Sequence, residues 1–392
     1  MSINQISQAT GFYDQTYFSK VFSAEYGATP KEYKKGGTRV KLIHTSDIHI
    51  DSPLTARLSP AEARERKREI INSFRNIIDD ARKIHAYGII IAGDLFDNDR
   101  VGVRSLDFII GVIEAAPDIM FFYLPGNHEK DRIISSGILL PENLKIFGED
   151  WTYFKIENVT IAGRSKISED MFSSLSLYEK DLNIVTLHGE LAASDTPEKI
   201  SVRKLSKLPI DYLALGHYHT YSENRISNRC TAVYSGTPEG RGFDEVGYKG
   251  YVIIDTDSDT VTHRFVKRAT RTLHSIRVDI SGVEREIEIE NRVADALYSI
   301  PSNDLVRIIL TGEYEPGLRR DTESLSARFG AKYFYFEAKD QSKLRISADD
   351  YKNDKSLKGE FIRLVMSKEE LSDDEKAAII ECGIRALAGE EL

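Results

Sequence analysis

Short apolar runs alternate with helical patterns along the chain from Val40 onward. Each run is rich in β-branched or aromatic residues, which predicts a buried strand, and each ends in a polar cluster. Residues 60–86 repeat apolar side chains at helical spacing and predict an amphipathic helix. The predicted strands are Val40–Ile43, Gly88–Ala92, Met120–Leu124, Ile184–Leu187 and Tyr212–Leu215, then a hairpin-like segment of Val233–Tyr234 and Gly250–Asp255 with Val261–Val266 as its partner strand. Strands that alternate with helices predict a layered α/β domain ending near Arg271.

The two ends of the chain follow other patterns. Residues 1–37 predict two short helices joined by a tight turn, which is a helix-turn-helix layout. After residue 271 we expect a smaller unit of strands and helices, followed by a tail with two amphipathic helical stripes. The expected domains are therefore 1–37, 38–271, 272–340 and 341–392.

Composition and charge narrow the class of protein. Of the 392 residues, 41% are hydrophobic and 29% are charged, which is typical of a folded protein in water. No apolar run approaches the roughly 18 residues of a membrane span, no export signal is present, and Cys230 and Cys382 form no metal or disulfide motif. These features predict a cytoplasmic protein without membrane association. The net charge of −9 argues mildly against a dedicated nucleic-acid binder, but bound cations offset carboxylates, so a nuclease is not excluded.

Five polar clusters, each placed directly after a predicted strand, carry the candidate chemistry. The carboxyl ends of strands in an α/β sheet face a common crevice, so residues far apart in the sequence can meet there. Carboxylate oxygens, an amide oxygen and neutral imidazoles suit a divalent transition metal. The clusters are Asp47-Ile-His49, Gly93-Asp-Leu-Phe-Asp97, Gly126-Asn-His-Glu129, His188-Gly189 and Gly216-His-Tyr-His219. The candidate ligands are Asp47, His49, Asp94, Asn127, His188, His217 and His219.

Each cluster alone is a weak signal, because an Asp-x-His at a strand end or a Gly-Asp turn is common in ordinary structure. Together they are specific, since five of the nine histidines in the chain fall within them. The other four histidines are interpreted as core or surface residues. Seven ligands are too many for one ion with an open position, whereas two ions about 3.5–4 Å apart and bridged by a carboxylate account for them. We expect Asp94 to be that bridge.

At these residues the sequence resembles the calcineurin-like metallophosphoesterase superfamily, over roughly residues 40–270. The resemblance implies a four-layer β-sandwich flanked by helices. It also implies that one metal is held by Asp47, His49, Asp94 and His219, and the other by Asp94, Asn127, His188 and His217. His128 matches the family's catalytic histidine. Manganese is the metal that the nuclease branch of the family implies.

Further residues resemble the SbcD-type DNA repair exonuclease branch. They are Tyr234-Ser-Gly-Thr-Pro-Glu239, Gly242-Phe-Asp-Glu245 and Gly247-Tyr-Lys-Gly250. This likeness implies DNA as substrate, a small α/β capping domain after Thr272, and a helical C-terminal tail that pairs with an SMC-like ATPase subunit. It also implies a homodimer. Some members of the branch carry histidine where Asp97 stands, so the role of that histidine does not transfer.

Residues 1–35 separately resemble the second helix-turn-helix of AraC-type regulators. The matching residues are Gly11-Phe12, Tyr17 to Phe22, and Gly27 to Tyr33. That family uses two such units and only one is present here. Ala24 and Glu25 stand at the end of the recognition helix, where basic residues would favour phosphate contact. A structural or vestigial segment is therefore favoured over a working DNA reader.

The expected function is metal-dependent phosphodiester hydrolysis, with DNA as the substrate and DNA repair as the setting. Water activated at the metals would attack phosphorus, and His128 would protonate the leaving 3′-oxygen as general acid, oriented by Asp97. One alternative is a metallophosphoesterase acting on nucleotides or other phosphoesters. Another is a DNA-binding regulator that works through the helix-turn-helix and has a decayed enzyme domain, against which the complete ligand set argues.

Overall fold

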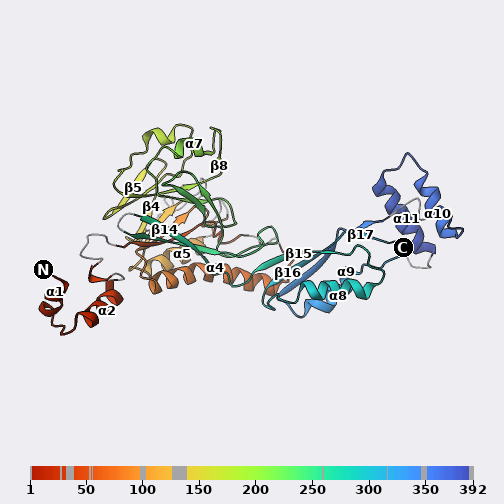
Figure 1. Ribbon diagram of the computed structural model, residues 1–392, viewed down its shortest axis with the longest axis horizontal. Helices are drawn as coiled ribbons and strands as arrows, with labels where there is room; N and C mark the ends of the chain where they lie inside the picture. Colours follow the sequence, from red (N-terminus) through yellow and green to blue (C-terminus); the bar gives the residue numbers. More distant parts are fainter. Residues whose placement is uncertain are drawn as a thin grey trace. The chain divides into compact units, whose positions relative to one another are not determined.

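A computed structural model describes residues 2–26, 29–31, 39–52, 54, 56–97, 103–125, 139–257, 260–315, 317–345 and 351–387. The chain forms two compact units, Met1–Thr270 and Arg271–Leu392 (Figure 1). The first unit begins with the short helices α1 (Ile3–Ala9) and α2 (Gln15–Tyr26). The side chain of Asp14 accepts a hydrogen bond from the backbone N–H of Thr16 at 2.8 Å and caps α2, as its position in the sequence predicts.

The first unit contains two six-stranded sheets, and the first of them carries the predicted strands Val40–Ile43, Gly88–Ala92 and Met120–Leu124. Its strand order is β14-β13-β1-β2-β3-β4. Strands β1 to β4 run parallel, and β13 pairs antiparallel with both β1 and β14. The strands are β1 (Lys41–Thr45), β2 (Gly88–Ala92), β3 (Met120–Leu124), β4 (Leu144–Ile146), β13 (Gly250–Asp257) and β14 (Thr260–Lys267).

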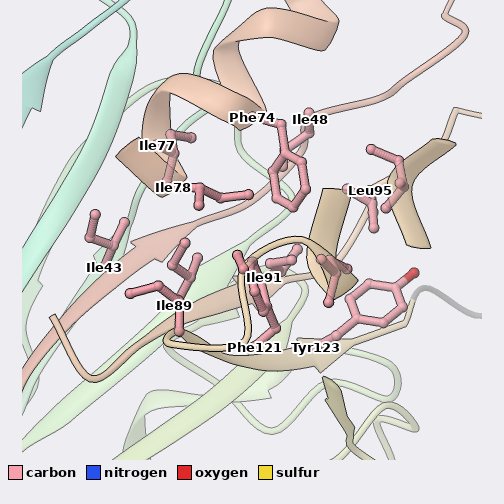
Figure 2. Close-up of a cluster of buried hydrophobic side chains, with 14 of the residues drawn as sticks. Ile43, Ile48, Phe74, Ile77, Ile78, Ile89, Ile91, Leu95, Phe121 and Tyr123 are labelled. Carbon is pink, nitrogen blue, oxygen red and sulfur yellow. The ribbon is translucent and has the colours of Figure 1, made fainter. Parts of the chain in front are cut away.

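Two helices, α4 (Pro60–Lys83) and α5 (Val103–Glu114), share a hydrophobic cluster with one face of this sheet. Helix α4 begins with a capping box between Ser59 and Glu62 and with Pro60 at its first position. In Figure 2, Phe74, Ile77 and Ile78 of α4 face side chains of the strands, including Ile89. All five residues of β2 are buried, as expected for a parallel strand that is covered on both faces.

The second sheet has the order β11-β12-β10-β7-β6-β5. Its strands are β5 (Thr152–Ile156), β6 (Val159–Gly163), β7 (Leu182–His188), β10 (Tyr212–Gly216), β11 (Ser222–Arg225) and β12 (Thr231–Tyr234). A buried cluster that includes Leu42, Ile90, Ile184 and Tyr212 lies between the two sheets. A second cluster covers the other face with the 3-10 turn Met171–Ser174, the strands β8 (Leu191–Ala192) and β9 (Ile200–Ser201), and helix α7 (Val202–Leu205). The expected two-sheet sandwich flanked by helices is thus confirmed.

One expected pairing is wrong. The segment Val233–Tyr234 was expected to form a hairpin-like unit with Gly250–Asp255. Instead β12 pairs with β10 and β11 in the second sheet, whereas β13 belongs to the first sheet. Residues 235–249 therefore cross from one sheet to the other. An apolar run predicts that a strand forms but not which strand it pairs with.

The second unit contains a three-stranded parallel sheet of order β15-β16-β18. Ile289 and Val293 of helix α8 and Leu325 of helix α9 pack into the same core as this sheet. The elements are β15 (Leu273–Asp279), α8 (Glu286–Ala296), β16 (Leu305–Thr311), β17 (Glu313–Tyr314), α9 (Thr322–Gly330), β18 (Tyr335–Asp340), β19 (Lys343–Leu344), α10 (Leu357–Met366) and α11 (Asp373–Leu387). Helices α10 and α11 pack together through Ile362, Val365, Ile380 and Ile384. Among the described residues, no helix has both the length and the apolar character needed to cross a membrane.

Candidate metal centre

Six of the predicted site residues lie at the carboxyl ends of four strands. Asp47 and His49 follow β1, and Asp94 follows β2, its parallel neighbour in the first sheet. His188 ends β7, and His217 and His219 follow β10, the parallel neighbour of β7 in the second sheet. The backbone N–H of His217 donates to both oxygens of Asp47, at 3.0 and 3.1 Å, and so joins the edges of the two sheets.

Four of these residues have an unusual backbone conformation. The φ angles of Asp47, His49, Asp94 and His217 are +50°, +50°, +47° and +106°. Residues with a side chain seldom adopt this region, and such strain persists mainly where the surrounding structure enforces it at functional sites. The turns after β1 and β2 are held by each other, because Asp47 N–H donates to Gly93 C=O at 3.1 Å and His49 N–H to Asp94 C=O at 3.0 Å.

The side chains form two groups of potential ligand atoms. Atoms of Asp47, His49 and His219 lie within 4.8 Å of one another, and so do atoms of Asp47, Asp94 and His188. Oδ2 of Asp94 is 3.8 Å from Nε2 of His49 and 3.4 Å from Nε2 of His188. Asp47 is common to both groups, and Asp94 of the second group also approaches His49 of the first, so Asp94 faces both groups as a bridging carboxylate must.

The imidazoles of His219 and His188 are oriented by hydrogen bonds on their far side, whereas Nδ1 of His49 lies beside a carboxylate without forming a hydrogen bond. Nδ1 of His219 is 2.6 Å from Oε1 of Glu245, Nδ1 of His188 is 2.9 Å from Ala92 C=O, and Nδ1 of His49 is 3.1 Å from Oδ1 of Asp97. An Nδ1–H that faces an oxygen leaves the lone pair of Nε2 directed toward the opposite side of the ring, here toward the aspartates. This is the arrangement of metal-ligating histidines in proteins.

The distance between two of these nitrogens fits a shared cation. Nε2 of His49 and Nε2 of His219 are 3.2 Å apart, and they lie 4.0 and 3.8 Å from Oδ1 of Asp47. Two nitrogens bound at about 2.1 Å to one ion, with a bond angle between about 90° and 110°, lie about 3.0–3.4 Å apart. Two lone pairs at that distance repel each other unless a positive charge lies between them. The donor set therefore fits a divalent metal.

Electrostatics also favour a cation in this place. The side chain of Asp47 is completely buried. Burial disfavours a charge on His188, yet the hydrogen bond with Asp94 and the charges of Asp47 and Asp94 outweigh it and raise the pKa of His188 to about 9. The pKa of Glu245 is lowered to about 2, because hydrogen bonds from His219 and Arg241 and the charge of Arg241 exceed the opposing effect of its burial.

Not all of the predicted residues join these groups. The ring of His217 lies 5.6 Å from the ring of His188, between centroids, but His217 belongs to neither ligand group. Asn127 and His128 lie outside the described residues, so their roles stay predictions. Asp97 was expected to orient His128. Its carboxylate faces His49 and accepts a hydrogen bond from Nη1 of Arg241 at 2.9 Å.

Arg241 and Glu245 both contact His219 Nδ1, although neither stands in a cluster that the sequence marks as a candidate site. Both lie in the segment 234–250, whose only feature in the sequence is its resemblance to the exonuclease branch. A short polar cluster after a strand was the signal for the ligands themselves. Arg241 and Glu245 follow no strand, so that signal could not find them.

Gly93 is a point at which the site can be tested without changing a ligand. Its φ is +93°, and a Cβ atom there would lie 2.0 Å from Nδ1 of His188. Replacing Gly93 by Ala should displace the imidazole and weaken the metal position at Asp94 and His188 by about 10–100-fold, as loss of an orienting contact does. Metal titration of the purified chain measures this effect.

The matched control is Gly111→Ala in α5, where a Cβ atom would meet nothing within 4 Å. That variant should bind metal normally and gain about 0.5–1 kcal/mol of stability from its higher helix propensity. Unchanged metal binding in Gly93→Ala would show that His188 does not depend on the close approach of residue 93.

Residues 40–244 match the family model described as calcineurin-like phosphoesterase, which is more than half of the chain. The chain belongs to this family. It is therefore a phosphoesterase, and the ligand groups described above are the place where this metallophosphoesterase would bind its divalent metals. Residues 1–33 match a second family model, that of bacterial regulatory helix-turn-helix proteins of the AraC family.

Several known proteins are similar to this phosphoesterase. The uncharacterized metallophosphoesterase YhaO of Bacillus subtilis is 25% identical over 297 residues, which cover 70% of this chain and 72% of YhaO. The DNA double-strand break repair protein Mre11 of Saccharolobus solfataricus is 24% identical over 370 residues, which cover 87% of this chain and 94% of that protein. A solved dimetal phosphatase from Danio rerio aligns with 59% of this chain and 99% of its own, at 10% identity and a TM-score of 0.37.

Proposed function

We propose that this phosphoesterase hydrolyses phosphodiester bonds in DNA, with two divalent ions that are manganese in the active enzyme. The observation that carries the proposal is the extent of the similarity to the DNA double-strand break repair protein Mre11. The aligned part covers 87% of this chain, so it extends beyond the phosphoesterase domain into the second unit. The ligand groups alone would serve any phosphoester, because they contact metal and phosphate and not the remainder of a substrate.

In this proposal each side chain has a defined task. Asp47, His49 and His219 would hold one ion, Asp94 would serve both, and His188 would hold the other. The family resemblance adds Asn127 and His217 to the second position. When bound, the ions activate water and neutralise charge on the phosphate oxygens. Glu245 and Ala92 C=O fix the imidazole rings of His219 and His188, Asp97 lies beside the ring of His49, and His128 would give a proton to the leaving 3′-oxygen.

Partners are part of the same proposal. The helical tail formed by α10 and α11 is proposed to contact an SMC-like ATPase subunit, and the enzyme is proposed to act as a homodimer. Leu357 and Leu364 of α10 are exposed to 70% and 60%, which leaves apolar surface for such a contact.

The decisive experiment is digestion of linear duplex and hairpin DNA by the purified full chain, beside a bis-aryl phosphodiester. We expect hydrolysis of both DNA substrates that depends on added manganese, stops with a chelator and returns when manganese is restored. An SMC-like ATPase, added in a parallel reaction with ATP, should change the rate or the products. Metal-dependent hydrolysis of the small diester without any cleavage of DNA would contradict the DNA proposal and favour a nucleotide or other small phosphoester as substrate.

A further inference from the structure

Arg241 occupies a central place behind the metal ligands. Its Nη1 donates to Oδ1 of Asp97 and to Oγ of Ser52, both at 2.9 Å. Its Nη2 and Nε donate to Oε1 of Glu245, at 2.6 and 3.0 Å. One guanidinium therefore spans the two carboxylates that face Nδ1 of His49 and Nδ1 of His219.

This arrangement is buried and held from several sides. The side chains of Arg241 and Glu245 are exposed to only 11% and 3%. The backbone N–H of Arg241 donates to Oε2 of Glu245 at 2.8 Å. Arg241 therefore binds Glu245 through both its main chain and its side chain. Nη2 of Arg241 also lies 3.0 Å from Nδ1 of His219. Glu245 is nearer to that nitrogen and is negatively charged. The Nδ1–H of His219 therefore donates its hydrogen bond to Glu245, and Nε2 keeps a lone pair that is free for a metal.

The segment that carries Arg241 is itself anchored by buried charges. Arg66 of α4, whose side chain is 1% exposed, donates from Nη1 to Glu239 at 2.9 Å and from Nη2 to Gly240 C=O at 2.6 Å. Lys249 donates from Nζ to the carbonyl of His219 at 2.6 Å. The segment is thus fixed to α4 on one side and to the backbone of a metal ligand on the other.

We propose that Arg241 is a positioning residue that sets the affinity of one metal position, the one formed by Asp47, His49 and His219. A planar guanidinium can hold both carboxylates at once in a fixed geometry, which a lysine ammonium cannot do. His188 is oriented separately, by Ala92 C=O, and none of the contacts of Arg241 described here reaches it. Loss of Arg241 should therefore weaken one position and spare the other. The inference rests on the proposed two-metal function.

A buried ion pair can also be purely structural, so the test needs a matched control. Arg320 of the second unit has the same design, because it bridges Asp340 and Glu381 at 2.7 Å each and its side chain is 13% exposed. Neither Asp340 nor Glu381 is one of the candidate metal ligands. Arg320→Gln removes a bridge of the same kind, although Asp340 and Glu381 are more exposed, at 25% and 39%, and it should leave the binding of both ions unchanged.

The experiment is a Mn²⁺ titration of the wild-type chain, Arg241→Gln and Arg320→Gln, read by calorimetry and by electron paramagnetic resonance. We expect two ions in the wild type and in Arg320→Gln. In Arg241→Gln, one ion should bind as in the wild type and the other about 10–100-fold more weakly. At limiting manganese, the spectrum of a coupled pair should give way to that of an isolated ion. Arg241→Lys keeps the positive charge beside Glu245, which makes it the second variant if the first does not fold, and the same position should weaken.

Two results would overturn the inference. A folded Arg241 variant that binds both ions as the wild type does would make the residue structural only. Equal weakening of both positions would remove the proposed selectivity. Failure of the proposed function looks different, since the wild-type chain itself would then bind fewer than two ions.

Discussion

Replacing Asp94 by Asn should release both metal ions at the concentrations that saturate the wild type and slow phosphodiester hydrolysis by about 10³-fold or more. Oδ2 of Asp94 is 3.8 Å from a nitrogen of one ligand group and 3.4 Å from a nitrogen of the other, so this carboxylate faces both ion positions, as does Asp47, which the two groups share. An amide keeps the shape but removes the negative charge that a second cation needs. Metals contribute several kcal/mol of transition-state stabilisation, and about 4 kcal/mol corresponds to that factor.

Metal content and kcat/KM of the purified variant measure this expectation. Asp304→Asn is the matched control, because Oδ2 of Asp304 also faces a histidine, Nε2 of His274 at 2.8 Å, but in the second unit and outside both ligand groups. It should keep two ions and full activity. An Asp94→Asn variant that retains both ions would exclude the bridging role.

The central strands could be predicted from the sequence because they are continuous apolar runs, whereas their arrangement in a two-sheet sandwich is implied by the family resemblance. Gly88–Ala92 is a continuous buried run, and such runs occur where both faces of a parallel strand are covered. The convergence of the ligands could also be predicted. Neighbouring parallel strands such as β7 and β10 end at the same edge of a sheet, so residues that follow them lie close together. The roles of Asn127, His128 and Asp97 and the expected domain boundaries stay predictions.

Other features depend on tertiary packing and leave no local pattern. The partner of Val233–Tyr234 is set by a crossing segment between the sheets, and the apolar pattern of a strand does not reveal that path. Glu245 meets His219 only because the segment 235–249 folds back on it, held by Arg66 and Lys249. The left-handed backbone of Asp47 and His49 has only a weak signal in residue type, because Asp and His adopt positive φ more often than most residues but far less often than glycine.

Replacing His128 by Ala should slow DNA hydrolysis by about 10²–10⁴-fold, the usual contribution of a positioned general acid or base. The residue stands beside Asn127 in the Gly126–Glu129 motif, and its proposed role is to protonate the leaving 3′-oxygen, not to bind metal. The alkoxide that leaves from DNA is a strong base and needs this proton. A nitrophenolate from an activated bis-aryl diester leaves without one, so the same variant should lose much less activity on that substrate.

The two variants can therefore be distinguished by substrate and by metal. Asp94→Asn should lose its ions and both activities together, whereas His128→Ala should keep two ions and lose mainly the cleavage of DNA. Metal analysis and parallel rate measurements on DNA and on the bis-aryl diester test both at once. Two results would contradict this role: loss of the metals from His128→Ala, or equal slowing of the hydrolysis of the two substrates. Either result would show that His128 does not donate a proton to the leaving group but holds phosphate or metal.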